Sequence, residues 1–228
     1  MKIPLISKGK DVPKHLAIST TRIKEWSEKK NKPLIDAVSL SYKKIYELIE
    51  NQTKKDIPII SILLTTKTEE EISGLNEFLQ KLTKEELINE KKIRVHVLGE
   101  WYGLDSDLTD SIKLITEETK DYDNYFLNLL VNYDGQKEIL ASLKLMIKKY
   151  EAEKLDIHDL SPEMVKENLA SSYFLPPDLI IENGGRYSGM LLWDSKGSVI
   201  YFTDKYWLDF DKSDLEDALK FYDKNKKI

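Results

Sequence analysis

The chain has 228 residues, no cysteine and a formal net charge of −5, from 35 Lys and Arg against 40 Asp and Glu. This length fits one α/β domain and 41% hydrophobic residues suffice for a packed core, so global disorder is excluded and we expect residues 1–228 to form a single domain. The lack of cysteine excludes disulfides, thiolate nucleophiles and cysteine-ligated zinc, and the acidic balance is atypical of a protein that binds nucleic acid.

Six short, mostly apolar runs predict β-strands. The runs cover residues 16–20, 59–65, 93–98, 125–131, 178–182 and 198–203. Near-continuous apolar runs of this length are typical of strands that are buried on both faces, as in a parallel sheet.

Helical patterns fill the segments between these strands. They cover residues 33–50, 68–90, 107–119 and 136–154, and two more helices begin near Ser161 and Ser213. Thr68 and Glu71 predict a capping box at the start of the second helix, where a Thr oxygen accepts from a free amide and a Glu reaches back. The alternation predicts an α/β fold with an open, mostly parallel six-stranded sheet and flanking helices.

Few residues point directly to chemistry. The three histidines, His15, His96 and His158, lie far apart and lack the i, i+4 spacing of metal ligands. We therefore predict no metal site from them, and we interpret His96, inside a predicted strand, as a core or edge histidine with satisfied hydrogen bonds.

The segment 183–189, Asn-Gly-Gly-Arg-Tyr-Ser-Gly, is a glycine-dense loop that directly follows a predicted strand. Ligands of α/β folds bind at the carboxyl ends of strands, where Arg186 and Ser188 can donate hydrogen bonds to an anion. A plain strand-to-helix turn explains the glycines equally well.

The order of several motifs resembles the cis-prenyltransferase (undecaprenyl diphosphate synthase) family over nearly the whole chain. Residues 13–18 (PKHLAI) resemble the family's P-x-H-V-A-I strand, and Trp26 falls on the Trp of its D-G-N-x-R-W motif. Residues 132–139 (NYDGQKEI) resemble N-Y-G-G-R-x-E-I, and residues 201–210 (YFTDKYWLDF) resemble the end of the motif L-Y-F-T-D-x-x-W-P-D-F.

This resemblance implies a magnesium-dependent condensation of an allylic diphosphate with isopentenyl diphosphate. It also implies a dimer, and a tunnel between sheet and helices that holds the cis-polyprenyl product. Such chemistry needs a carboxylate that positions Mg²⁺ on the leaving diphosphate, and donors that absorb the charge of the diphosphate.

The family's functional positions carry other residues in this sequence. The motif D-G-N-x-R-W becomes Thr21-Arg22-Ile23-Lys24-Glu25-Trp26, so that its carboxylate is lost and its loop Arg is a Glu. In the family's R-T-x-G-E-x-R-x-S loop the first Arg becomes Glu182, and a later metal-binding Glu aligns with Val199. We therefore predict no catalytic residue and no metal ligand.

Three residues are the candidates for binding a diphosphate. Arg186 and Ser188 match the family's Arg and Ser for isopentenyl diphosphate, and Arg22 lies in the first phosphate loop. Each lost electrostatic contact to a transition state costs about 10²–10³ in rate, and several are lost together.

The sequence favours a catalytically degenerate homologue, the non-catalytic subunit of a heteromeric polyprenyl diphosphate synthase. Its partner would be a catalytic homologue, or a second copy in a dimer. Apolar and aromatic residues of the last third are candidates for the interface or, equally, for the core: Leu191, Leu192, Trp193, Tyr201, Phe202, Trp207 and Phe210.

Two alternatives stay open. One is a protein that binds a prenyl diphosphate without chemistry, and the other is an active prenyltransferase with a rebuilt site that uses Asp36, Glu25 or Glu182. Magnesium is expected only with such a site or with a partner's site. No apolar run spans a bilayer and the start lacks the core of a signal peptide, so we expect a cytoplasmic protein, with peripheral membrane contact as a family expectation.

Overall fold

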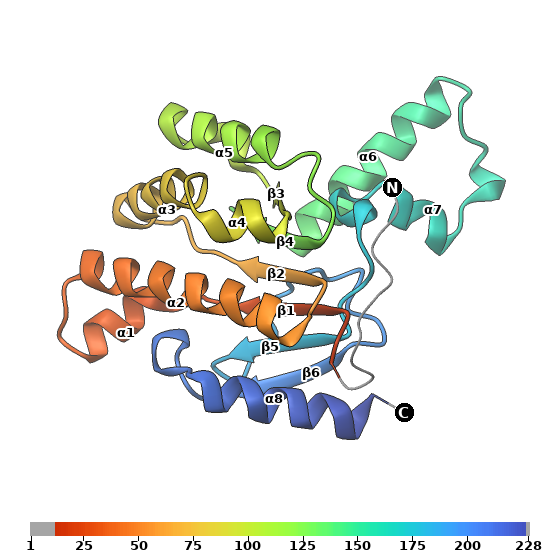
Figure 1. Ribbon diagram of the computed structural model, residues 1–228. Helices are drawn as coiled ribbons and strands as arrows, with labels where there is room; N and C mark the ends of the chain where they lie inside the picture. The colour runs from red at the N-terminus through yellow and green to blue at the C-terminus, as the bar shows by residue number, and fades with distance from the viewer. Residues whose placement is uncertain (1–11, 227–228) are drawn as a thin grey trace.

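The computed structural model describes residues 12–226, and a six-stranded sheet forms its centre (Figure 1). The strands are β1 (His15–Ser19), β2 (Ile59–Leu63), β3 (Ile93–Leu98), β4 (Tyr125–Leu130), β5 (Leu179–Asn183) and β6 (Val199–Thr203). Their order is β3-β4-β2-β1-β5-β6, and all five pairings are parallel. The predicted α/β fold is confirmed, and each strand begins and ends within two residues of its prediction.

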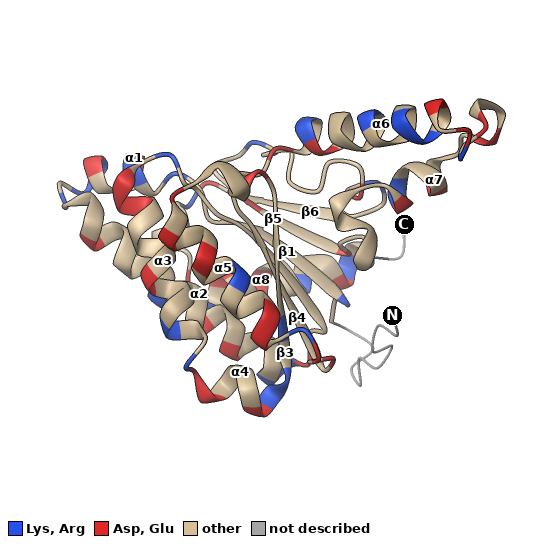
Figure 2. Ribbon diagram, turned by 90° about the horizontal axis from the view of Figure 1, so that it is seen from above, with Lys and Arg blue, Asp and Glu red and all other residues tan. Residues whose placement is uncertain are grey.

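Helices cover the two faces of the sheet unequally (Figure 2). One face carries α1 (Ile23–Lys29), α2 (Leu34–Lys55), α3 (Glu69–Leu82), α4 (Glu86–Lys91), α5 (Ser106–Glu118) and α8 (Lys212–Asn225). On the other side lie α6 (Gly135–Glu151) and α7 (Pro162–Glu167), and the segment from Phe174 to Leu191 packs a smaller core there. The inner strands β1, β2 and β5 are buried along their whole length, which explains their unbroken apolar sequences.

Within residues 12–226, side-chain caps fix the starts of five α-helices, among them α3, α6 and α8. The capping box of α3 forms as predicted, with Thr68 Oγ1 accepting from the amide of Glu71. Asp134 caps α6 by accepting from the amides of Gln136 and Lys137. In α8 the capping box consists of Asp211 and Asp214, two residues before the predicted cap at Ser213.

The structure differs from the prediction in two helices. The segment 68–90 holds two helices instead of one: Thr83 Oγ1 donates back to Leu79 O, and Glu85 turns to an extended backbone and accepts from Tyr46 Oη at 3.0 Å. Helix α1 was not predicted, because its seven residues give too short a pattern. It begins after Arg22, whose backbone is left-handed with φ 68°.

Three of the seven C-terminal residues that the sequence left open between core and interface belong to the core. Leu191, Trp207 and Phe210 are almost completely buried, whereas Phe202 on the edge strand β6 is 47% exposed. A different apolar surface lies on the projecting helix α6, where every third or fourth residue is an exposed apolar residue: Leu140, Leu143, Ile147 and Tyr150. Within residues 12–226 none of the helices has the length and hydropathy needed to cross a bilayer.

Candidate functional site

A cleft of about 630 Å³ lies at the carboxyl edge of the sheet. The loops that follow β1, β2, β4 and β5 line it, through residues such as Thr21, Lys67, Tyr133 and Ser188. Parallel strands bring their carboxyl ends together at one edge, so segments far apart in the chain meet there. This is the place where the sequence analysis expected a ligand.

The loop after β1 is held by its own hydroxyl groups. Thr20 Oγ1 donates to Leu63 O at 2.8 Å, and the hydroxyls of Ser19 and Thr21 lie 3.1 Å apart. Ile23 lies between the cleft lining and the core, is almost completely buried, and offers the cleft no polar group. The loop therefore offers the cleft the hydroxyl of Thr21 where the resembling motif has a carboxylate.

The guanidinium of Arg22 is held by the loops after β5 and β6. Its Cζ lies 4.5 Å from the centre of the Tyr206 ring, a cation–π contact. A Cβ atom on Gly184, which has φ +92°, would lie 2.0 Å from Arg22 Nη1, so the glycine leaves room for the guanidinium. Arg22 lines the cleft, but its charged group is already held by the protein.

The loop after β5 closes around a buried carboxylate. Glu182 is 1% exposed, and its Oε1 accepts hydrogen bonds from the amide of Ser188 at 3.0 Å and from the hydroxyl of Ser188 at 2.7 Å. Burial raises the pKa of Glu182 above its usual value, while the hydrogen bonds from Ser188 and Ser19 act in the opposite direction. The hydroxyl of Ser188, a predicted diphosphate ligand, thus donates to the protein's own carboxylate.

The loop after β2 has the same construction. Glu71, 4% exposed, accepts from Thr65 Oγ1 at 2.6 Å, from the amide of Lys67 at 2.7 Å and from the amide of Thr68 at 3.3 Å. Its position in the cleft was missed, although the capping box that places it was predicted. A capping box indicates only where a helix begins, and does not show that its Glu lines a site.

The structure brings only two of the three candidate ligands to the cleft. Arg22 and Ser188 line it together, whereas Arg186 is exposed outside this lining and makes no hydrogen bond or ion pair with residues 12–226. Lys24 and Lys67 line the cleft as well and were not predicted. Both stand within five residues of the carboxyl end of a strand, β1 and β2 respectively, which is the signal that could have identified them.

The side chains at the cleft do not fit the magnesium that the resemblance implies. Thr21 offers a hydroxyl that is shared with Ser19, and Val199 is apolar and lies level with Leu179 and Leu16, away from the carboxyl edge. Of the earlier alternatives Glu25 lines the cleft, but within residues 12–226 no three His, Cys, Asp or Glu side chains form a group that could hold a metal.

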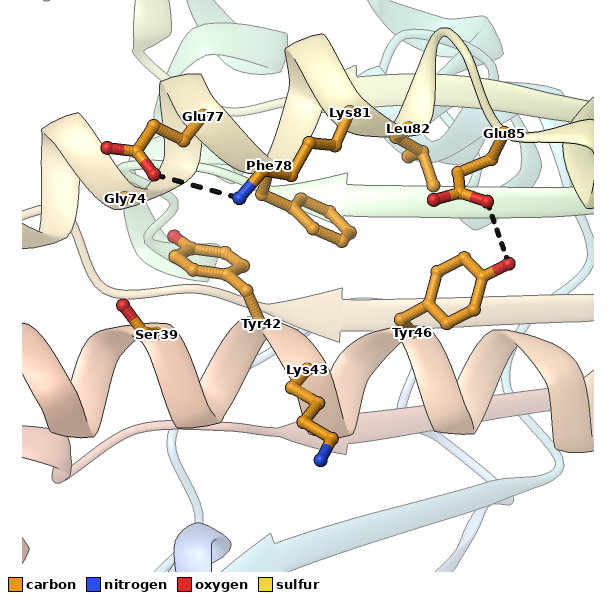
Figure 3. A pocket seen from close by; sticks show the side chains of 10 residues that line it. All are labelled: Ser39, Tyr42, Lys43, Tyr46, Gly74, Glu77, Phe78, Lys81, Leu82 and Glu85. Atoms are coloured by element: carbon orange, nitrogen blue, oxygen red, sulfur yellow. Dashed lines mark hydrogen bonds and ion pairs between the residues drawn. The ribbon is translucent and has the colours of Figure 1, made fainter.

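A second hollow of about 270 Å³ lies between α2 and α3, with Glu85 at one end (Figure 3). At its floor the rings of Tyr42 and Phe78 stack with centroids 4.9 Å apart. A Cβ on Gly74 would lie 2.3 Å from Val38 Cγ1, so the two helices are in direct contact beside the stack. At this place the side chains of α2 and α3 pack directly against each other.

The buried histidines lie outside both hollows. His15 Nδ1 and Nε2 lie 2.6 Å from Leu175 O and 2.8 Å from Ser61 Oγ, so both ring nitrogens have partners. His96 is on the edge strand β3 as predicted, but its buried Nε2 has no partner among residues 12–226, so the prediction of a satisfied histidine is wrong for that atom. Burial lowers the pKa of each of the two histidines to about 4.

Comparison with known proteins identifies the family. Residues 21–228 match the prenyltransferase family model described as "Putative undecaprenyl diphosphate synthase". The chain belongs to this prenyltransferase family. The family resemblance seen in the sequence is thereby confirmed.

Curated relatives of the family match along most of their length. The isoprenyl transferase of Oceanobacillus iheyensis is 26% identical, with all of this chain and 97% of that protein covered. The isoprenyl transferase of Thermotoga maritima is 29% identical (95% and 96% covered). The geranylgeranyl-diphosphate-specific tritrans,polycis-undecaprenyl-diphosphate synthase of Thermoplasma volcanium is 28% identical (94% and 88% covered).

Solved structures show the same fold. The lavandulyl diphosphate synthase from Lavandula x intermedia, crystallised with dimethylallyl diphosphate, superposes with a TM-score of 0.87 at 23% identity, covering 94% of this chain and 97% of that one. A probable undecaprenyl diphosphate synthase from Campylobacter jejuni gives 0.70 at 22% identity, covering 93% and 95%.

Proposed function

We propose that this member of the prenyltransferase family does not transfer prenyl groups alone, and acts as the non-catalytic subunit of a heteromeric polyprenyl diphosphate synthase. The donor set of the cleft carries the proposal. Thr21 stands where the family motif has its carboxylate, and the side chains around it form no group of metal ligands within residues 12–226. A diphosphate leaving group without metal support leaves far more slowly.

The filled space beneath α2 and α3 supports the same proposal. A growing prenyl chain needs an open apolar channel, and the Tyr42–Phe78 stack and the contact of Val38 with Gly74 occupy that space. The same observation disfavours the alternative of a protein that stores a prenyl diphosphate, since the stacked rings restrict the space between α2 and α3 to a hollow of about 270 Å³.

Two exposed apolar surfaces favour a protein partner. Leu143 and Ile147 stand in the stripe on α6, and Phe202 stands on the unpaired edge of β6. Contiguous exposed apolar side chains and exposed edge strands mark contact surfaces. We propose a catalytic homologue as the partner, and a second copy of this chain is the other outcome of the test.

The test is incorporation of labelled isopentenyl diphosphate. The protein is given farnesyl diphosphate and Mg²⁺, first alone and then with the catalytic homologue from the same source. We expect no polyprenyl product from the protein alone, and a changed rate or chain length in the mixture. Product from the protein alone contradicts the proposal and establishes an active enzyme with a rebuilt site, in which Glu25 would be the first residue to replace.

A pair of variants tests whether α6 forms the contact with the catalytic partner. We expect the double variant Leu143→Lys, Ile147→Lys to lose the mixed complex in size-exclusion chromatography, because two charges enter its apolar contact. Lys148→Ala, on the same helix and exposed, is the matched control and leaves the complex intact. A mixed complex that survives the double variant rules out α6 as the contact surface.

A further inference from the structure

Two loops of the cleft are closed around carboxylates of the protein itself. Glu182 accepts hydrogen bonds from both the amide and the hydroxyl of Ser188, at 3.0 Å and 2.7 Å. Glu71 accepts hydrogen bonds from the hydroxyl of Thr65 and from the amides of Lys67 and Thr68. Both carboxylates are almost completely buried; Glu182 lies near the carboxyl end of β5, and Glu71 lies in the first turn of α3.

The donors used in this way are of the kind that holds phosphate groups. Successive backbone amides and hydroxyls that converge on one oxygen form a concave site for anions. A carboxylate supplies the oxygen and the negative charge that a phosphate would bring. Because each donor is already engaged, a phosphate that enters the cleft would have to displace a buried carboxylate or bind without these hydrogen bonds.

The charged side chains that line the cleft do not make up for the donors that Glu182 and Glu71 occupy. The cations that line it are Arg22, Lys24 and Lys67, and the carboxylates that line it are Glu25, Glu28 and Glu71. The guanidinium of Arg22 is already stacked on Tyr206. A dianion therefore meets as many negative as positive groups in the cleft lining, with Glu182 directly behind Ser188.

We propose that Glu182 and Glu71 are built-in occupants of two anion-binding loops, and that they make the cleft reject phosphate and diphosphate groups. This inference rests on the proposed function in one respect: a cleft that does not bind diphosphate has no substrate for prenyl transfer. It concerns binding by this chain alone. It therefore stands or falls separately from the existence of a catalytic partner.

The experiment is calorimetric titration with metal-free pyrophosphate. The natural chain is expected to show no binding at millimolar pyrophosphate. The Glu182→Ala variant frees the amide and hydroxyl of Ser188 and removes one negative charge, so we expect its affinity for pyrophosphate to exceed that of the natural chain by about tenfold or more. Glu182→Gln keeps an acceptor for Ser188 and removes only the charge, so a smaller gain is expected.

The matched control is Glu25→Ala, which removes a charge from the lining of the same cleft without freeing a loop donor. Its gain in affinity is expected to be well below that of Glu182→Ala. An equal gain in both variants overturns the proposal, since charge alone would then explain the effect. Tight binding of pyrophosphate by the natural chain, or no gain in folded Glu182→Ala and Glu182→Gln, overturns it as well.

Discussion

The ring of Tyr42 on α2 stacks on the ring of Phe78 on α3, with an interplanar angle of 22°. The stack joins two of the long helices that cover one face of the sheet. It makes the space between the helices part of the core, and the floor of the hollow in Figure 3 is the outer side of this contact. Stability and ligand access are therefore coupled at these two residues.

Replacement of Tyr42 by Ala tests this coupling. The loss of a half-buried aromatic ring is expected to lower the free energy of unfolding by about 2–4 kcal/mol, measured by urea denaturation. The new space is apolar, so farnesol should raise the melting temperature of the variant and leave the natural protein unchanged. Absence of a farnesol effect on the folded variant would show that the surrounding side chains collapse into the space.

Gly74→Ala tests the contact between α2 and α3 from the other side. An added methyl group would lie 2.3 Å from Val38 Cγ1, so we expect a loss of about 1–3 kcal/mol in spite of the better helix propensity of Ala. Gly103→Ala is the control, because a Cβ at that position meets nothing within 4 Å. Equal stability of the two variants in urea would mean that the helices separate readily at Gly74.

The buried histidines predict acid sensitivity. His15 and His96 have folded-state pKa values of about 4 against about 6.5 in the unfolded chain. Between these values the unfolded chain binds more protons, so stability is complete above pH 6.5 and falls as the pH drops towards 4, by about 1.4 kcal/mol per pH unit and histidine. Urea midpoints measured from pH 7.5 to 4.5 give this slope.

His15→Gln is the variant that isolates one of these histidines. This variant should reduce the pH dependence of the free energy of unfolding by the share of about one proton. Some stability should also be lost at pH 7, because the hydrogen bonds to Leu175 and Ser61 change. The exposed His158 offers the matched replacement, His158→Gln. An unaltered slope in His15→Gln would contradict the assignment.

Glu138 predicts a sharp difference between two substitutions. Its carboxylate accepts from Tyr133 Oη at 2.6 Å and from the amide of Ser171 at 3.0 Å. Glu138→Ala leaves both buried donors unpaired and is expected to lose about 2–4 kcal/mol, whereas Glu138→Gln retains an acceptor and loses less. Burial raises the pKa of Glu138, so its contribution to stability is largest below the unfolded value and falls as the pH rises through the folded value.

The free energy of unfolding of Glu138→Ala and Glu138→Gln is measured by urea denaturation at pH 5 and pH 8. The Glu138→Gln variant should lose less stability at pH 8 than at pH 5, relative to the natural chain, because the cost of ionising a buried carboxyl disappears with it. Equal losses at the two pH values would show that Glu138 is ionised without such a cost.

The strands could be predicted almost completely because each inner strand is an unbroken apolar run. The short helix α1 could not, since its helical course depends on the left-handed backbone at Arg22 and on the burial of Ile23 and Trp26 against distant segments. Similarly, the sequence left open whether Trp207 belongs to the core or to an interface, because core and interface residues have the same sequence pattern, and the structure places it in the core. Trp207 Nε1 donates to Ser41 Oγ, a partner 166 positions away.

At the cleft, the sequence indicated which loops meet but not what each side chain contacts. Ser188 was correctly placed at the carboxyl edge, yet its donation to Glu182 depends on the turn of the loop between them. The role of Glu71 was likewise hidden, because a capping box predicts the start of a helix and says nothing of what lies beside it.

The strand order has a consequence for synthesis of the chain on the ribosome. β1 pairs with β2 on one side and with β5 on the other, and the amide of His15 bonds to the carboxylate of Asp178, 163 positions later. The first strand made therefore waits for one of the last before its hydrogen bonds are complete. Until then an apolar edge stays open, and this nascent chain is expected to depend on chaperones during most of its translation.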